Sequence, residues 1–97
     1  MKARYSAAAR VEFLQAVAYL EERQEGVGRK FAIEVRQALR EVVNHPLRWP
    51  KLTKSERWYR LNRFTYGLVY RVHPAEIEIV AVMHAHRKPG YWRRRRR

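Results

Sequence analysis

The 97-residue sequence predicts a single α+β domain, in which an N-terminal helical hairpin packs on a small, mainly antiparallel β-sheet. Three observations predict this class. A chain this short can bury only one core. Apolar residues recur at helical spacing up to residue 44, and runs rich in β-branched and aromatic residues follow from residue 57. Helices followed by strands in this order are typical of a helical layer on one face of a sheet.

Two amphipathic helices are expected between Ser6 and Asn44. Ser6 is suited to cap the first helix, and a turn at Gly26 and Gly28 separates it from the second. The apolar residues that mark one face of each helix are Phe13, Ala16, Val17 and Leu20, then Phe31, Val35, Ala38, Leu39 and Val42. The second helix should stop near Asn44, because the residue before Pro46 is disfavoured in the α conformation.

Three strands are expected in the second half of the chain. They are RWYRLNRF at 57–64, YGLVYRV at 66–72 and EIEIVAVMH at 76–84. Turn residues between them favour an antiparallel meander. The apolar run 77–83 predicts a central strand covered by the helices on at least one face. Residues 1–5 are expected to add a short edge strand.

The formal net charge of +13 is concentrated in the second half of the chain. Residues 1–45 hold eight Lys and Arg and six Glu, a net of +2, whereas residues 46–97 hold fourteen and three, a net of +11. Such a surface attracts a polyanion, either nucleic acid or an acidic protein. The absence of cysteine excludes disulfides, thiol chemistry and cysteine-based zinc sites. With no apolar segment of membrane-spanning length and no apolar leader at the N-terminus, we expect a cytoplasmic protein.

The domain is expected to occupy residues 1–92. Residues 93–97 are five consecutive arginines. Like charges in such a run repel one another, so we expect a basic C-terminal tail that is disordered when unbound.

His84 and His86 are the first candidates for chemistry. On a strand, an H-x-H pair places both rings on one face, where they could share a metal. A metal site needs a third ligand, and the neighbouring sequence offers no Asp or Cys, so no metal or cofactor is expected. Either ring is also suited to move a proton in RNA cleavage.

Arg60, Arg63 and Arg87 are candidates to contact phosphate. Strand alternation places Arg60 on the open face of the sheet, with Arg63 near the strand end; the alternative is that both are solvated surface charges. Tyr91 and Trp92 follow Arg87 and are suited either to stack on bases or to close the core, and we expect Trp92 to pack.

Four segments together resemble the RelE/ParE superfamily of bacterial type II toxin–antitoxin toxins. They are the helical stretch 7–39, the connection HPLRWP at 45–50, the strand pair RFTYGLVYRV at 63–72 and the closing VMHAHRKPGYW at 82–92. The resemblance implies a toxin with two helices on an antiparallel sheet. It also implies neutralisation, in a hetero-oligomer, by an antitoxin encoded beside it. Because the half of the chain with a net charge of +11 attracts such a partner, we expect an acidic or amphipathic segment of the antitoxin to wrap the basic sheet and cover the helices.

The resemblance implies two possible targets. RelE-like members cleave mRNA in the ribosomal A site with basic residues of the sheet and a C-terminal arginine and tyrosine, whereas ParE-like members poison DNA gyrase and lack that set. Arg60 and Arg87 match two of the basic positions, and Tyr91 or Trp92 falls near the tyrosine. Where the nuclease pattern has basic residues, this chain has Gly67 and Trp58.

These departures and the long helical hairpin favour a ParE-like gyrase inhibitor. The alternatives are a ribosome-dependent mRNA endonuclease and a non-toxic module that binds nucleic acid. For the nuclease, the candidate catalytic residues are Arg60, Arg63, His84, His86, Arg87 and Tyr91. For contact with a target or an antitoxin, they are Arg60, Arg63, Arg87, Lys88, Tyr91, Trp92, Arg93 and Arg94.

Overall fold

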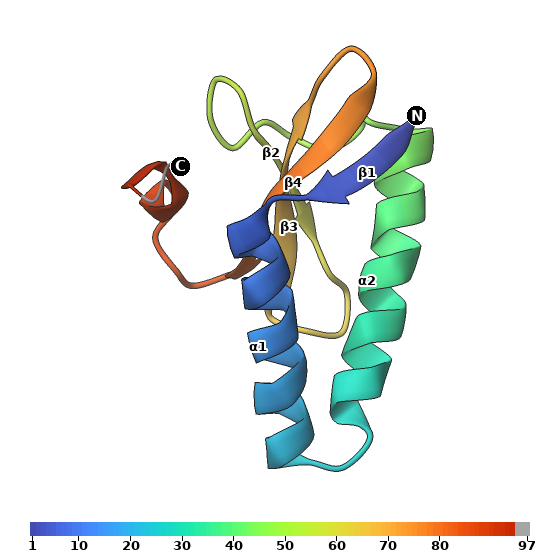
Figure 1. The fold of residues 1–97 in the computed structure, drawn as a ribbon, viewed down its shortest axis with the longest axis vertical. Helices are drawn as coiled ribbons and strands as arrows, with labels where there is room; N and C mark the ends of the chain where they lie inside the picture. Colours follow the sequence, from blue (N-terminus) through green and yellow to red (C-terminus); the bar gives the residue numbers. More distant parts are fainter. Residues whose placement is uncertain (95–97) are drawn as a thin grey trace.

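A computed structural model, which describes residues 1–94, confirms the α+β class (Figure 1). The elements in chain order are β1 (Lys2–Tyr5), α1 (Ala7–Arg23), α2 (Val27–Asn44), β2 (Arg57–Arg60), β3 (Tyr66–Val72), β4 (Glu76–His84) and a 3₁₀ helix, η1 (Tyr91–Arg94). The two helices run antiparallel along one face of the sheet, and η1 lies at its other side. Within residues 1–94, neither helix is long and apolar enough to cross a membrane.

The sheet is mixed, with the strand order β1-β4-β3-β2. Strands β2, β3 and β4 form the expected antiparallel meander. The expected edge strand β1 pairs in parallel with β4, from Lys2 opposite Glu76 to Tyr5 opposite Ile79. The prediction that the apolar run 77–83 forms a central strand is therefore confirmed.

Local sequence signals set the ends of the helices as expected. The Ser6 hydroxyl accepts the N–H of Ala9 at 3.0 Å and caps α1. Gly26 adopts φ 87° at the turn between the helices, a conformation that glycine takes without steric cost. Gly28 lies inside α2 and not in the turn, and a Cβ there would be 2.6 Å from the carbonyl oxygen of Val17. Because Gly28 has no side chain, α2 can approach the backbone of α1 this closely.

The sheet has an apolar cluster on each face. The larger cluster joins both helices to the sheet and includes Phe31, Val35, Ala38, Val42, Leu68, Tyr70, Ile77, Ile79 and Val82. The smaller cluster contains Val69, Val80, Ala81, Met83 and Trp92, with Leu52, Trp58 and Tyr91 packed against it. Loop 50–56 and η1 therefore cover part of the sheet face that the helices leave open.

A β-bulge explains how one strand serves both clusters. Tyr70 lies opposite Ile79 and Val69 lies opposite Ala81, so Val80 is an extra residue in β4. Val80 and Ala81 both join the smaller cluster, and Val82 returns to the larger one. Because successive residues of β4 face one cluster or the other, nearly all residues of the run 77–83 are apolar.

The predicted strand 57–64 is wrong in its second half, because β2 ends at Arg60. The N–H groups of Asn62 and Arg63 point to the Glu34 carboxylate of α2, at 2.6 and 3.3 Å. Residues 61–64 therefore form a loop, and the alternation of Asn62 and Arg63 on opposite faces of a strand is not observed. Leu61 is buried all the same, with 2% of its surface exposed.

The boundary expected at residue 92 falls within η1, which extends to Arg94. The side chain of Trp92 is buried in the smaller cluster, as expected for a packing residue. Arg93 approaches the buried Glu56, with 3.6 Å between Nη2 and Oε1. Residues 95–97, which belong to the expected tail, lie outside the described residues.

Candidate functional site

The segment that closes the chain returns to α1 and brings three candidate groups together. The Tyr91 hydroxyl donates to Glu12 Oε2 at 2.6 Å. The Arg87 guanidinium carbon lies 3.4 Å from the centre of the Tyr91 ring, in a cation–π contact. Glu12 Oε1 also accepts the N–H of Val82 at 2.9 Å, beyond the last residue of β4 that pairs with β1. Glu12 therefore takes the place of a strand partner and holds Tyr91 at the same time.

A cleft of about 250 Å³ lies between α1 and the adjoining ends of β3 and β4. Its lining combines aromatic, cationic and polar groups: Glu12, Gln15, Ala16, Tyr19, Tyr66, Val82, His84 and Arg87. Arginine and histidine are suited to bind an anion, and the tyrosine rings offer stacking surfaces. The cleft is the place in the structure where the predicted residues Arg87 and His84 converge.

The two histidines do not form the predicted pair on one strand, because β4 ends at His84 and His86 lies in the following turn. Their rings are nevertheless 5.3 Å apart. The N–H of His86 donates to His84 Nδ1 at 3.2 Å, which leaves the proton on Nε2 to be donated to the Thr65 hydroxyl at 3.0 Å. Both nitrogens of His84 have partners. In the described part of the chain, no three His, Cys, Asp or Glu side chains are placed so that they could hold a metal ion together.

Arg60 and Arg63 lie apart from Arg87. Arg60 is exposed at the end of β2, opposite Gly67. Arg63 lines a second cleft of about 270 Å³ against α2, together with Lys30, Ile33, Glu34, Gln37, Tyr59 and Asn62. Lys88 is exposed in the loop before η1. The basic candidates are thus divided between two clefts and the surface.

Gly67 and Trp58 are coupled in the structure. A Cβ on Gly67 would lie 2.5 Å from Trp58 Cη2 and 2.5 Å from the Tyr59 carbonyl oxygen. The indole of Trp58 therefore occupies the space that a side chain at position 67 would need. Gly67 and Trp58, the two positions that depart from the nuclease pattern, therefore depend on each other for their packing.

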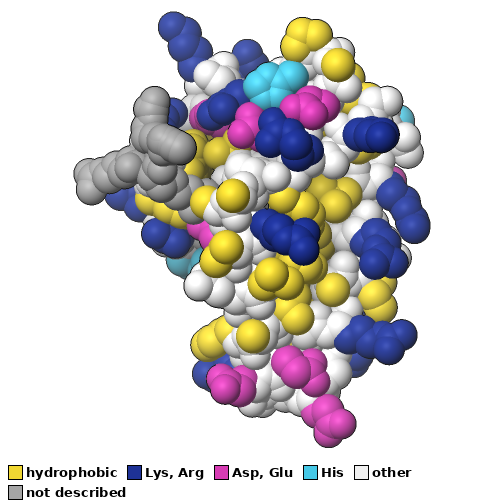
Figure 2. All heavy atoms as spheres, in the orientation of Figure 1, with side chains coloured by type: hydrophobic (Ala, Val, Ile, Leu, Met, Phe, Trp, Pro, Cys, Tyr) yellow, Lys and Arg dark blue, Asp and Glu magenta, His cyan; other side chains and the backbone are white. Residues whose placement is uncertain are grey.

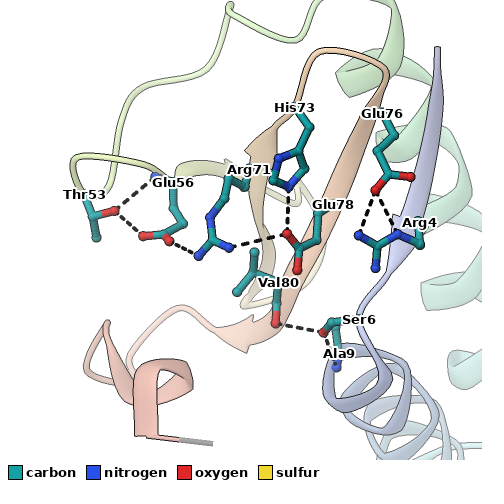
Figure 3. Close-up of polar contacts among 10 residues, drawn as sticks. All are labelled: Arg4, Ser6, Ala9, Thr53, Glu56, Arg71, His73, Glu76, Glu78 and Val80. Atoms are coloured by element: carbon teal, nitrogen blue, oxygen red, sulfur yellow. Dashed lines mark hydrogen bonds and ion pairs between the residues drawn. The ribbon is translucent and has the colours of Figure 1, made fainter. Parts of the chain in front are cut away.

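An ion network on the open side of the sheet was not predicted from the sequence (Figure 3). Arg71 pairs with both Glu56 and Glu78, and Glu78 also pairs with His73 at 2.8 Å. Glu56 is only 3% exposed and accepts the Thr53 hydroxyl as well. Burial alone raises the pKa of the Glu56 carboxyl, but the hydrogen bonds from Arg71 and Thr53 outweigh it and lower the pKa.

The sequence contains one signal for this network. Glu56 is the only acidic residue between Glu41 and Glu76, in a stretch that carries seven Lys and Arg. A lone carboxylate among so many cations is well placed to become an ion-pair partner. Its partner Arg71 comes from β3, so the pair forms only when the sheet is assembled.

Two helices on one face of a mixed sheet, with a basic segment that closes the chain beside α1, define the class of toxins found in bacterial type II toxin–antitoxin modules. The family described as "ParE toxin of type II toxin-antitoxin system, parDE" matches residues 3–89, and the chain belongs to this family. The resemblance to the RelE/ParE superfamily is therefore confirmed.

The fold is similar to a solved structure described as "Chromosomal ParDE TA system from P. aeruginosa". The TM-score is 0.65 at 16% sequence identity, and the match covers 87% of this chain and 95% of that chain. At this identity the likeness concerns the fold alone. A search of curated proteins finds no significant match.

Proposed function

We propose that the protein stops growth by inhibiting DNA gyrase through protein–protein contact and without catalysis. One observation favours gyrase over mRNA as the target. The hydroxyl of Tyr91 is bound to Glu12, and the face of its ring is covered by Arg87. A nuclease of the resembled type needs an arginine and a tyrosine free to act on phosphate and proton. Here the two residues bind each other and α1.

The sheet supports the same choice. The position where the nuclease pattern has an arginine is Gly67, and Trp58 fills the space above it. Of the two clefts described above, one is lined by Arg87 and the other by Arg63, and Arg60 lines neither. A substrate phosphate held by Arg87 would therefore lack the further cations that stabilise charge in the transition state.

Two assays with the purified protein test the proposal. The first measures supercoiling of relaxed plasmid by gyrase, which the protein should inhibit. The second measures mRNA cleavage on programmed ribosomes, which should not occur. Intact supercoiling together with truncated mRNA would reject the gyrase proposal in favour of the nuclease. Expression without any antitoxin should arrest growth, and normal growth would favour the non-toxic nucleic-acid module. Gyrase and ribosomes are cytoplasmic, which fits the expected location.

We assign the antitoxin to the exposed apolar side of α1. The residues Ala7, Val11, Leu14 and Ala18 recur at helical spacing on the side away from the core, and Val11 and Leu14 are each 52% exposed. In Figure 2, apolar side chains lie among polar and charged ones over the region that α1 occupies in Figure 1. An amphipathic helix of the antitoxin can bury this stripe, and acidic residues on that helix would be attracted by the net charge of +13.

Leu14→Asp should weaken binding of the cognate antitoxin roughly tenfold or more, since it removes about 1–2 kcal/mol of apolar burial and places a charge at the contact. Gln24→Asp adds the same charge at the exposed C-terminal end of α1 and is the matched control. Calorimetric titration of each variant with the antitoxin gives the two affinities. Equal losses would place the antitoxin elsewhere on the toxin.

A further inference from the structure

The outer face of α2 carries a row of arginines that neither proposal above uses. Arg29, Arg36 and Arg40 are spaced at i, i+7 and i+11, so they lie along one side of the helix. All three are exposed, and at about 1.5 Å per residue the row is about 16 Å long. In Figure 2, Lys and Arg side chains follow the flank of the molecule that α2 forms in Figure 1. We call these three residues the α2 arginine row.

The acidic residues of α2 do not neutralise this row. Glu34 is turned towards the loop after β2, where it accepts two backbone N–H groups. Glu41 pairs with Arg48 at 3.7 Å. Over residues 1–94, no ion pair involves Arg29, Arg36 or Arg40. The charges of the row are therefore available to an external anion.

Of the other acidic residues of the hairpin, Glu12 is bound to Val82 and Tyr91, and three lie at the tip, near Arg29 but far along the helix from Arg36 and Arg40. Glu21, Glu22 and Glu25 lie at the end of α1 and in the turn to α2. Glu21 is occupied there, because its carboxylate accepts the N–H groups of Gly26 and Gly28 at 2.8 and 3.0 Å. The acidic side chains of the tip therefore lie at one end of the row, beside Arg29, and Arg36 and Arg40 extend from there along α2.

We propose that the α2 arginine row binds the phosphate backbone of double-helical nucleic acid without reading its sequence. Arginine presents a planar set of donors that matches phosphate, and a helix holds the three side chains in a fixed row. One strand of duplex DNA carries a phosphate about every 3.4 Å along the axis, so the row spans about five phosphates. A contact with phosphates alone carries no sequence information.

Two features favour a duplex over other polyanions. A protein interface has an apolar centre and few charges, as the α1 stripe does, but Ile33 is the single large apolar side chain beside the row. Binding of single strands depends on aromatic rings that stack on bases. The only aromatic residue of α2 is Phe31, which is fully buried. The row thus offers three cations beside one exposed apolar side chain, and α2 has no exposed aromatic ring.

This second surface goes beyond toxicity and does not depend on the gyrase proposal. The apolar stripe of α1 and the arginine row of α2 lie on different helices of the hairpin. A toxin with its antitoxin bound on α1 would still present α2 to nucleic acid.

The test compares two triple variants of the full chain in binding to a fluorescent 20-base-pair duplex of arbitrary sequence. Arg29→Gln, Arg36→Gln and Arg40→Gln together remove the row. Their control combines Lys2→Gln, Arg10→Gln and Lys54→Gln, which remove the same charge from exposed positions elsewhere. Anisotropy titrations over a range of NaCl concentrations give the affinity and its salt slope. Thermal melting by circular dichroism checks that both variants are folded.

Loss of the row should weaken duplex binding roughly tenfold or more. The slope of the logarithm of the binding constant against the logarithm of the salt concentration should fall in magnitude by about 2 to 3, because each phosphate contact contributes about 0.9. The control should lower the slope by less than about 1. Equal effects of the two triple variants would overturn the proposal, because the duplex would then respond to total charge. An equal or larger loss with a poly-glutamate peptide would also overturn it and assign the row to an acidic protein. A larger loss with a 20-nucleotide single strand would overturn the preference for a duplex.

Discussion

Replacing Gly67 with alanine should destabilise the fold, although it adds only one methyl group. The new Cβ would lie 2.5 Å from Trp58 Cη2 and from the Tyr59 carbonyl oxygen, and 2.8 Å from Trp58 Cζ2. Ordinary contacts of this kind are 3.4–4 Å, so both the ring and the backbone must move by about an ångström. Such overpacking costs about 1–3 kcal/mol. For a domain of this size, each kcal/mol lowers the Tm by about 4–8 °C.

The double variant Trp58→Ala/Gly67→Ala separates the two contacts. Trp58→Ala removes two of the three atoms nearest to the new methyl and leaves the Tyr59 carbonyl oxygen, so Gly67→Ala should cost less in the Trp58→Ala background than in the natural chain. The expected coupling between the two sites is of the order of 1 kcal/mol. Urea unfolding followed by far-ultraviolet circular dichroism gives all four free energies of unfolding. This signal does not depend on the indole that is removed.

Equal costs of Gly67→Ala in both backgrounds would show that Trp58 does not fill the space above position 67. A stable Gly67→Ala variant would have the same meaning. Either result would also remove the steric argument that this chain has no room for an arginine at position 67, and would weaken the case against RNA cleavage.

Three further substitutions test the contacts around the closing segment and the ion network. Tyr91→Phe removes a hydrogen bond to the Glu12 carboxylate and should lower the free energy of unfolding by about 1.5–3 kcal/mol in urea titrations; an unchanged midpoint would mean that the bond does not hold η1. Trp92→Ala should lower the free energy of unfolding by about 3–5 kcal/mol. The lower end is expected, because the buried indole N–H has no hydrogen-bond partner among the described residues. A loss of stability below about 1 kcal/mol would contradict the burial of this side chain. Arg71→Gln should destabilise the protein most at pH 7. The pKa of Glu56 is lower in the folded protein than its value of about 4.3 when unfolded, so its stabilising effect is complete above that value and is lost as pH falls through the folded pKa. The variant and the natural chain should therefore converge in stability as the solution is acidified; a constant difference would exclude Glu56 as the cause.

The parts of the fold that depend on local pattern were predictable from the sequence. The cap at Ser6 and the end of α2 follow from residue types within a few positions. Strands β3 and β4 follow from their apolar and β-branched runs, and the predicted bounds are the observed ones. The order of helices and strands predicted a helical layer on one face of the sheet, and the family resemblance implied the same arrangement.

The features that were missed depend on contacts between distant segments. Strand β2 stops early because Glu34 on α2 accepts the N–H groups that would have continued it. The bond between Tyr91 and Glu12 joins residues that are 79 positions apart. The bulge at Val80 adds an unpaired residue that strict alternation cannot reveal. At the site, sequence spacing placed Arg87 beside Tyr91 correctly, but it gave no sign that the two side chains bind each other.

The pairing of β1 with β4 sets how late in synthesis the sheet can close. Residues 2–5 pair with residues 76–79, so β1 has no partner until β4 has been made. The helical hairpin, whose contacts are local, can form earlier, and the sheet closes late. Trp92 and Arg93, which cover the open side of the sheet, are made later still. A nascent chain therefore leaves the smaller apolar cluster uncovered until Trp92 has been made, well after the helical hairpin is available to fold.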